Sequence, residues 1–485
     1  GHICAKGKAR FFDLYHPLRL RKPLRRRNPE KGIGVDPQWE EISWEAALEE
    51  VTARLKKVYD EDPRGLVIAH FDLPAYGISK AFGEAFGTPN LHWNRADYCG
   101  SAPHVANLLV NGSFNGELDL DLGEYLVLWG TQFGHRVETI PLHAAHKLAD
   151  ARARGARLVV IDPFCTNACA KADEWVPIRP GTDGALALGM LRAMVVELRA
   201  VDYPFLRQHT NAPYLIGSSG HYLRDAGDRK PLVWDTTTGT ARSFDQVDPS
   251  AMALEGSYEV NGQVVRPAFQ CLATHLEGIS IAKMSEITTV PAGTIRRLAR
   301  DFTKAARIGS TIELNGRSLP FRPASIHFKR GSGAHKGGFH TMMAIHLINV
   351  MVGNIDVPGG QRGVNPIGPY WEIEADEDGM LVPAEIITKY SRPYPPAQAK
   401  APSTFDLREL FPTALFTRGL YPLGIAEAER FDLPYRAQVL LHGRTNLMMN
   451  SHNREAMGSV LRSIPFQVSF ADGIDETVEF ADIVL

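Results

Sequence analysis

The sequence predicts an α/β protein of several domains, built on Rossmann-like parallel sheets. Short apolar runs that fit buried strands alternate along the chain with helical patterns, the order that parallel sheets require. Two of these runs open into a glycine followed by polar residues, at Gly130 and at Gly443. The length of 485 residues, at roughly 150 residues for each domain, indicates about three domains.

The predicted elements follow one another in a regular order. The first helix begins after Ser43, which can cap it, and Ala47, Val51 and Leu55 give it one apolar face. The next elements are a strand at 65–70, a strand at 124–130, a helix over about 141–154, a strand at 156–162 and a helix over about 184–200. This alternation is typical of βαβ units.

The second half of the chain is less regular. Further strands are expected at 438–443 and 466–470, whereas 201–270 is polar and rich in turns. The stretch 366–434 is rich in proline and acidic residues and is expected to run over the surface. The closing run 480–485 has the pattern of a buried strand, and the chain opens on Gly1 without an initiator methionine. We therefore expect an internal fragment, whose cellular compartment is not readable.

Composition and charge exclude some classes of partner. The chain is 44% hydrophobic and 22% charged, with a net charge of −2, which is ordinary for a globular protein. The basic stretch 15–27 lacks interleaved aromatic residues, so a surface or anion-facing strand is expected there and no nucleic-acid site. No run of about 18 apolar residues indicates a transmembrane helix.

The five cysteines are too few for a disulfide framework at this length. They are Cys4, Cys99, Cys165, Cys169 and Cys271. Cys165 and Cys169 are not spaced as a CxxC pair, so two buried thiols are expected.

Polar residues gather where two predicted strands end. Glycines there let phosphates approach backbone N–H groups. In each of the two places a later strand ends in an acid, Asp162 or Asp472, which can accept hydrogen bonds from a ribose or a guanine edge. Neither loop has the GxGxxG pattern of an NAD site. The nearest string, at 331–337, has the wrong last spacing and is expected to be a flexible loop.

Several strings resemble, in the same order, segments of the dimethyl sulfoxide reductase family of molybdopterin oxidoreductases. They are Cys4-Ala5-Lys6-Gly7 with Tyr15-His16-Pro17, the segment 162–183, Gly353-Asn354-Ile355-Asp356-Val357-Pro358-Gly359-Gly360, and 475–485. The resemblance implies a catalytic subunit with Mo or W held by two molybdopterin guanine dinucleotides, and a [4Fe–4S] cluster in the full-length protein. It places an iron–sulfur remnant at 1–45, a discontinuous pterin-binding domain at 46–118 with 326–485, and an inserted one at 119–325. The family's pterin-closing C-terminal domain would be absent.

The resemblance also implies the binding residues. Cys4 matches the last of four cluster cysteines, and Lys6 matches the lysine between the cluster and one pterin. One pterin would bind Gly130, Thr131, Gln132, Asp162, Thr166, Gly181, Thr182 and Asp183. The other would bind Gly443, Asn446, Asp472, Glu476 and Thr477.

Cys99 occupies the place from which the family presents a protein ligand to the metal. A soft thiolate suits Mo or W, although Asp97 is an alternative ligand. His104, His135 and Arg136 are candidates for a substrate funnel, because cationic donors orient an oxyanion. For each of these three, a surface or pterin-contacting role is an equal alternative.

The resemblance implies a two-electron transfer of an oxo group or sulfur atom on a small inorganic substrate, with a lean towards sulfur compounds. Expected partners are a membrane anchor subunit together with an iron–sulfur electron-transfer subunit, and no nucleic acid. Two alternatives stay open: a non-redox tungsten hydratase, and a structural protein related to the large iron–sulfur subunit of respiratory complex I.

Overall fold

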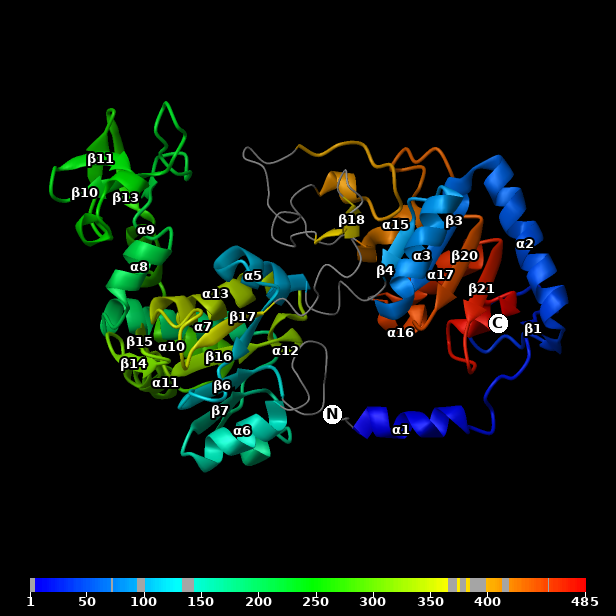
Figure 1. Ribbon diagram of the computed structural model, residues 1–485, viewed down its shortest axis with the longest axis horizontal. Coiled ribbons are helices and arrows are strands. Elements are labelled where there is room, and N and C mark those ends of the chain that lie inside the picture. The colour runs from blue at the N-terminus through cyan, green and yellow to red at the C-terminus, as the bar shows by residue number, and fades with distance from the viewer. Residues whose placement is uncertain are drawn as a thin grey trace. The chain divides into compact units, whose positions relative to one another are not determined.

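The computed structural model describes residues 5–70, 73–93, 101–132, 144–364, 373–375, 381–383, 398–411, 418–451 and 453–485. Two compact units share the chain (Figure 1). Unit 1 is Ala102–Pro366, and unit 2 combines Ala5–Ser101 with Ile367–Leu485. The described part of the chain holds no helix both long and apolar enough to cross a membrane.

Unit 1 is built on a four-stranded parallel sheet. Its strand order is β16 (Ala324–Phe328), β6 (Tyr125–Trp129), β7 (Arg157–Ile161) and β8 (Glu174–Val176). The chain proceeds from β6 to β7 and β8 in one direction, and β16 then lies on the other side of β6. The strand order therefore reverses between β6 and β16, and in such sheets ligands bind at the carboxyl ends beside the reversal.

Apolar side chains cover both faces of this sheet. Val127 and Trp129 of β6 pack in a large core with the helices, while Leu126 and Leu128 pack on the opposite face with Leu148 of α6. The helices are α5 (Ser101–Asn111), α6 (Ala144–Ala153), α7 (Asp183–Arg192), α8 (Tyr203–His209), α9 (Ala268–Glu277), α10 (Ile281–Thr288), α11 (Ala292–Ala305), α12 (Arg330–Gly333) and α13 (Gly338–Met351). A π-helical segment, Ala193–Glu197, continues α7.

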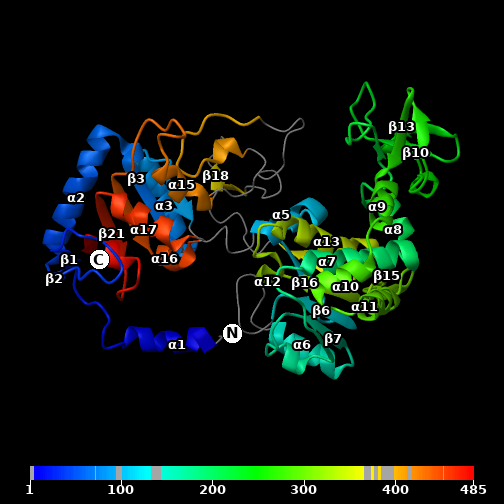
Figure 2. The same ribbon diagram turned by 180° about the vertical axis from the view of Figure 1, so that it is seen from behind.

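Smaller sheets complete unit 1. The polar stretch after α7 forms a separate β-rich part, seen at the end of unit 1 that carries α8 and α9 in Figure 2. Its strands are β9 (Leu215–Ile216), β10 (Leu232–Asp235), β11 (Thr240–Ser243), β12 (Tyr258–Val260) and β13 (Gln263–Pro267). The other pairs are β14 (Thr311–Leu314) with β15 (Arg317–Pro320), and β5 (Asn115–Leu118) with β17 (Gln361–Val364).

Unit 2 has a seven-stranded sheet. Its order is β2 (Glu40–Glu41), β1 (Leu24–Arg25), β22 (Ile483–Val484), β21 (Phe466–Phe470), β20 (Val439–Gly443), β3 (Leu66–His70) and β4 (Leu91–Trp93). The pairs from β22 to β4 are parallel, and β1 is antiparallel to both of its neighbours. Here the strand order reverses between β3 and β20, so a second ligand-binding edge is expected there.

The helices of unit 2 are α1 (Ala5–Leu14), α2 (Trp44–Glu61), α3 (Leu73–Phe86), α15 (Tyr421–Ala426), α16 (Leu447–Asn450) and α17 (Arg454–Ser463). Two short strands, β18 (Ile373–Ala375) and β19 (Leu381–Pro383), pair with each other. Ser43 caps α2 as predicted, because its Oγ accepts the N–H of Ala46 at 3.2 Å. The predicted α/β class with parallel sheets is confirmed.

The division of the chain differs from the expected domain boundaries. We expected 326–485 to join 46–118, but β16 pairs with β6 and β17 pairs with β5 inside unit 1. The stretches 102–118 and 326–364 therefore lie with unit 1. The expected iron–sulfur remnant 1–45 contributes β1 and β2 to the sheet of unit 2.

Candidate functional site

The loops after β6 and β16 meet at Gly130. This glycine has a φ of +61°, and a Cβ built on it would lie 2.5 Å from the backbone nitrogen of Ser332. Gly331 N donates to the Gly130 carbonyl at 3.0 Å. The string 331–337 was expected to be a flexible loop; instead its first residues form part of α12 and pack against Gly130. Only a glycine fits this position, because both the left-handed φ and the close contact exclude a side chain.

Two predicted acids lie near this contact. Asp183 opens α7, is buried, and accepts the indole N–H of Trp129, the last residue of β6, at 2.8 Å. Asp162 follows β7 and accepts the N–H of Phe164 at 3.0 Å. Burial raises the pKa of both carboxyl groups, and the charge of Asp183 interacts with those of Asp162 and His335. Partly desolvated carboxyl groups of this kind gain from further hydrogen-bond donors, such as a ribose hydroxyl or a guanine amine.

The remaining predicted site residues of unit 1 lie in loops beside these acids, and the hydrogen bonds that Thr166 and Thr182 make there are local. Thr131 and Gln132 follow Gly130 and are half-buried. Gly181 has a φ of +76° before α7, and the Thr182 hydroxyl donates to the Arg179 carbonyl at 2.6 Å. Thr166 bonds within its own loop, with Cys169.

The cysteines of that loop are free thiols. Our expectation of burial holds for Cys169 and is wrong for Cys165, which is exposed.

In unit 2, three predicted residues form one hydrogen-bonded cluster. Asn446 Nδ2 donates to Glu476 Oε2 at 2.5 Å, and Thr477 Oγ1 donates to Asn446 Oδ1 at 2.9 Å. Asn446 also caps α16 by accepting the N–H of Met449 at 3.1 Å. The hydrogen bond from Asn446 lowers the pKa of Glu476. The cluster joins Asn446, in the loop after β20, to Glu476 and Thr477, in the segment between β21 and β22. Gly443 is the last residue of β20, directly before the first of these loops.

Asp472 stands apart from this cluster. Its carboxylate pairs with Arg19 at 2.9 Å and lies 3.7 Å from Arg10. Arg19 belongs to the basic stretch 15–27, which was expected to face anions. The anions that Arg19 and Lys22 contact are carboxylates of the protein itself, because Arg19 pairs with Asp472 and Lys22 pairs with Glu41. Asp472 therefore meets a cation in the same unit, and its oxygens are not shared with the Asn446 cluster.

Several predicted site residues lie outside the described residues. They are Cys4, Cys99, His135 and Arg136, together with the side chain of Lys6 and the alternative ligand Asp97. Within the described ranges, no group of three His, Cys, Asp or Glu side chains could hold a metal ion. The metal and cluster roles of these residues stay predictions.

His104 was expected to be a cationic funnel residue, and the structure contradicts that charge. The side chain is buried in α5, its Nδ1 lies 2.8 Å from the Phe114 carbonyl, and its ring stacks on Phe114. Burial, aided by the nearby Lys329, lowers the pKa of His104 to about 3. The imidazole is therefore neutral at physiological pH, and Nδ1 is the donor.

A His104→Gln variant tests this neutral state. Unfolded histidine takes up a proton below about pH 6.5, whereas folded His104 resists protonation down to about pH 3. The native protein therefore loses stability as pH falls through this window, by roughly 3 kcal/mol at pH 4 from this group. Urea unfolding at pH 7 and pH 4 should show a smaller loss for the variant; an equal loss would contradict the assignment.

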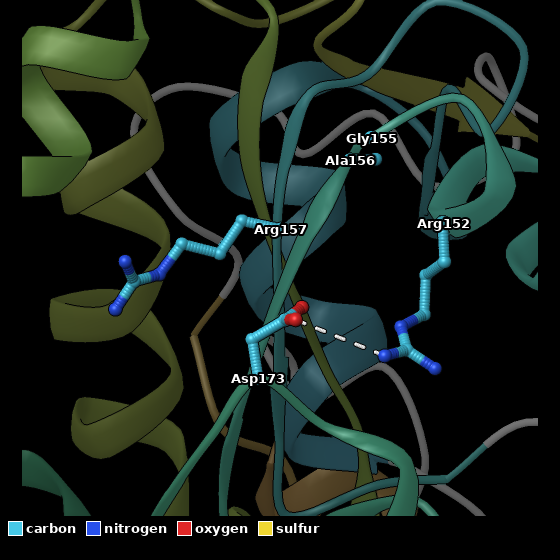
Figure 3. A pocket seen from close by; sticks show the side chains of 5 residues that line it. All are labelled: Arg152, Gly155, Ala156, Arg157 and Asp173. Carbon is cyan, nitrogen blue, oxygen red and sulfur yellow. Dashed lines mark ion pairs between the residues drawn. The ribbon is translucent and has the colours of Figure 1, made fainter.

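A pocket of about 310 Å³ lies at the amino-terminal end of β7, away from Gly130 (Figure 3). Arg152 points across it to Asp173, with 3.8 Å between their charged atoms, whereas Arg157 points away and pairs with Glu174. The two arginines do not converge on one anion. The pocket lies at the opposite end of the strand from Asp162 and is separate from the carboxyl edge.

The two strand-order reversals, each with polar residues at its carboxyl edge, define an α/β protein of the kind whose parallel sheets bind ligands at that edge. The molybdopterin oxidoreductase family model matches residues 19–485, and the chain belongs to this family. Membership implies a molybdenum or tungsten pterin cofactor. The glycine contact at Gly130 and the desolvated acids beside it fit a ligand with phosphate groups and a polar base.

Individual relatives agree with this assignment. The chain is 31% identical to a sulfite dehydrogenase subunit of Allochromatium vinosum, over 100% of this chain and 54% of that protein. It is also 31% identical to PhsA, the molybdopterin-containing subunit of thiosulfate reductase from Salmonella typhimurium, over 43% of this chain and 26% of that protein. The chain thus spans about half of the length of the sulfite dehydrogenase subunit, and its match to PhsA covers 26% of that protein.

A solved structure shares the fold. Acetylene hydratase from Pelobacter acetylenicus superposes with a TM-score of 0.63 at 20% identity, over 100% of this chain and 57% of that chain. At this identity the likeness concerns the fold alone.

Proposed function

We propose that this chain is the catalytic part of a Mo or W bis(pterin guanine dinucleotide) oxidoreductase. The reaction would be a two-electron transfer of an oxygen or sulfur atom to or from a small inorganic sulfur compound. The observation that carries the proposal is the pair of sheets with parallel strands, each with glycine and acidic residues gathered at the carboxyl edge beside the reversal of its strand order. The sulfur substrate is supported by relatives named sulfite dehydrogenase and thiosulfate reductase.

The chain's own residues would hold the two dinucleotides. In unit 1, the loops that meet at Gly130 would lie against the phosphates, and Asp162 and Asp183 would accept hydrogen bonds from ribose or guanine. In unit 2, Glu476 would accept such hydrogen bonds and the second N–H of Asn446 Nδ2 would donate to the ligand, with Thr477 fixing the Asn446 amide through its hydroxyl. The bound metal and pterins would supply the atom and electron transfer, while the protein orients them.

The remaining site residues complete the proposal by family resemblance. Cys99 would be the protein ligand to the metal, with His135 and Arg136 orienting an oxyanion. Cys4 would be one of the four ligands that a [4Fe–4S] cluster needs, and Lys6 would lie between that cluster and a pterin.

Partner subunits are part of the proposal. Relatives are named as subunits of larger enzymes, among them one of dimethylsulfide dehydrogenase from Rhodovulum sulfidophilum. An electron-transfer subunit with further iron–sulfur clusters would exchange electrons with this chain, and a membrane anchor subunit would hold the assembly. Hydratase chemistry gains no support from the acetylene hydratase fold, because at 20% identity only the fold is shared.

Metal analysis tests the proposal. The full-length protein, purified without oxygen, should contain about one Mo or W and about four Fe per chain, the iron of one four-iron cluster. Cys99→Ala should lose turnover by about a hundredfold or more, since even residues that only support a metal ligand contribute 10- to 100-fold. A Cys271→Ser control, on α9, should keep both metal and turnover. Iron without Mo or W would contradict the proposal.

A further inference from the structure

A layer of buried polar side chains lies beside β16, and the proposed cofactor site does not use it. Ala324, Ile326 and Phe328 face the large apolar core. The alternate residues, Ser325 and His327, are equally buried but lie on the other face of the strand. That face packs against β5 and β17, so a strand with a polar face is covered completely by protein.

Side chains from β16, from Lys329 just after it and from α5 bond to Phe114, Asn115 and Gly116, which are three successive residues at and just before the start of β5. Lys329 Nζ donates to Asn115 Oδ1, and His327 Nδ1 lies 2.9 Å from the Gly116 carbonyl. His104 is held by the carbonyl of Phe114 in the same way. Glu117 follows, with its Oε2 3.7 Å from His327 Nδ1. The layer is therefore a continuous polar row.

Several atoms of this layer are buried without a hydrogen-bond partner among the described residues. They include Asn115 Nδ2, Glu117 Oε1, Ser325 Oγ and Gln361 Oε1. Buried polar atoms nearly always have a partner, either in the protein or in ordered water. An internal water needs two to four polar neighbours, and a row that mixes donors with acceptors provides them.

Among the residues that the structure describes, no charged partner compensates the Glu117 carboxylate fully. Burial lowers the pKa of His327 to about 3, so this histidine is neutral and its contact with Glu117 is not an ion pair. His104 is neutral for the same reason, and Arg362, opposite Glu117 on β17, is exposed. Lys329 favours the carboxylate, but burial outweighs it and raises the pKa of Glu117 to about 8. A protonated Glu117 can also donate a hydrogen bond, which a carboxylate cannot.

We propose that this polar layer is a site for internal water, and that Glu117 holds an exchangeable proton in it at neutral pH. The layer reaches the carboxyl ends of the strands, because Lys329 directly precedes α12, whose Gly331 contacts Gly130. The proton is thus stored beside the edge to which the cofactor is assigned.

The use of this proton rests on the proposed function. Release of an oxygen atom as water takes up two electrons and two protons, and the electrons come from the electron-transfer subunit. Glu117 supplies one proton through the internal water and becomes a carboxylate beside Lys329. The second proton comes from bulk water, which also reprotonates Glu117 afterwards.

Infrared spectroscopy of the intact chain tests the stored proton without any bound cofactor. The wild type should show a protonated-carboxyl stretch at pH 7 that disappears as the pH rises through about 8. Glu117→Gln, which keeps the shape of the side chain, should lack this band. The control Glu313→Gln, at an exposed glutamate on β14, should keep it. A wild type without the band, or a Glu117→Gln variant with it, would overturn the inference, and the wild-type titration decides even if the variant fails to fold.

Kinetics of the loaded enzyme test the use of the proton. Glu117→Gln should lower kcat by about a hundredfold, the low end for a proton-transfer residue, and leave KM unchanged. It should also lose the wild type's decline in kcat as the pH passes about 8. If the wild type shows the infrared band and Glu117→Gln keeps the wild-type kcat, the proton is stored at Glu117 but is not supplied to the reaction. A protein that binds no Mo or W but shows the band would refute the proposed function and leave the proton site standing.

Discussion

Gly130→Ala is expected to remove the pterin that the proposed function assigns to unit 1 while the one assigned to unit 2 stays, which halves the pterin content of the purified protein. A Cβ at this position would lie 2.5 Å from the Ser332 nitrogen and 3.0 Å from the Gly331 carbonyl carbon. Both are backbone atoms, so the loop after β16 must move away from β6. The left-handed φ of +61° adds strain of roughly 1–2 kcal/mol. Pterin released from the protein and measured by fluorescence gives the content.

Gly155→Ala is the matched control for this experiment. Gly155 also has a left-handed φ, +98°, but a Cβ there would meet no atom within 4 Å. The control therefore carries the backbone strain without the clash. Equal loss of pterin in both variants would attribute the effect to strain alone, and full pterin content in Gly130→Ala would show that the edge of unit 1 does not bind the cofactor.

Asp202→Ala is expected to destabilise unit 1 by about 3–5 kcal/mol, the usual penalty for leaving one partner of a buried ion pair alone. The Asp202 carboxylate pairs with Arg322 at 2.6 Å, and the side chains are only 4% and 7% exposed. Asp202 also caps α8 by accepting the N–H of Phe205 at 3.1 Å. Urea unfolding followed by tryptophan fluorescence measures the change, since Trp129 lies in the core of this unit.

An exposed ion pair supplies the comparison. Glu255 pairs with Arg199 at 2.8 Å, but the two side chains are 45% and 65% exposed. Glu255→Ala should therefore change stability by less than about 1 kcal/mol. A combined Asp202→Leu and Arg322→Met variant should recover most of the loss, because it removes the unpaired buried charge. A loss below about 1 kcal/mol for Asp202→Ala would contradict the buried-pair argument.

Local patterns predicted the strands that build the two carboxyl edges where the strand order reverses. The apolar runs that became β3, β6, β7, β20 and β21 are buried on both faces, so their composition alone identifies them. β16 was missed because Ser325 and His327 interrupt its apolar pattern. Its polar face is covered by β5 and β17, and no local signal in the sequence reports a covering strand that lies far away along the chain.

The candidate site shows the same limit. The cluster of Asn446, Glu476 and Thr477 could be predicted because Asn446 follows the glycine at the end of a predicted strand, and Glu476 and Thr477 stand within the family string 475–485. The pairing of Asp472 with Arg19 joins residues 453 positions apart, and no motif contains both. The neutral state of His104 likewise depends on burial by distant segments. His335 and Ser332 were missed as neighbours of the site, although the glycine-rich string around them was the available signal.

The pairing of β5 with β17 also has a consequence for the order in which the protein folds. Unit 1 is inserted in the chain between β3 and β20, which pair with each other in unit 2. The pairing of β5 with β17 brings the two ends of this insertion side by side. Once unit 1 has folded, the loop that must close before β3 can meet β20 is much shorter, which saves about 1 kcal/mol of closure entropy. During synthesis on the ribosome, however, the edge of β3 that pairs with β20 stays unpaired until β20 (Val439–Gly443) has emerged. The sheet of unit 2 is therefore expected to be completed after unit 1 has folded.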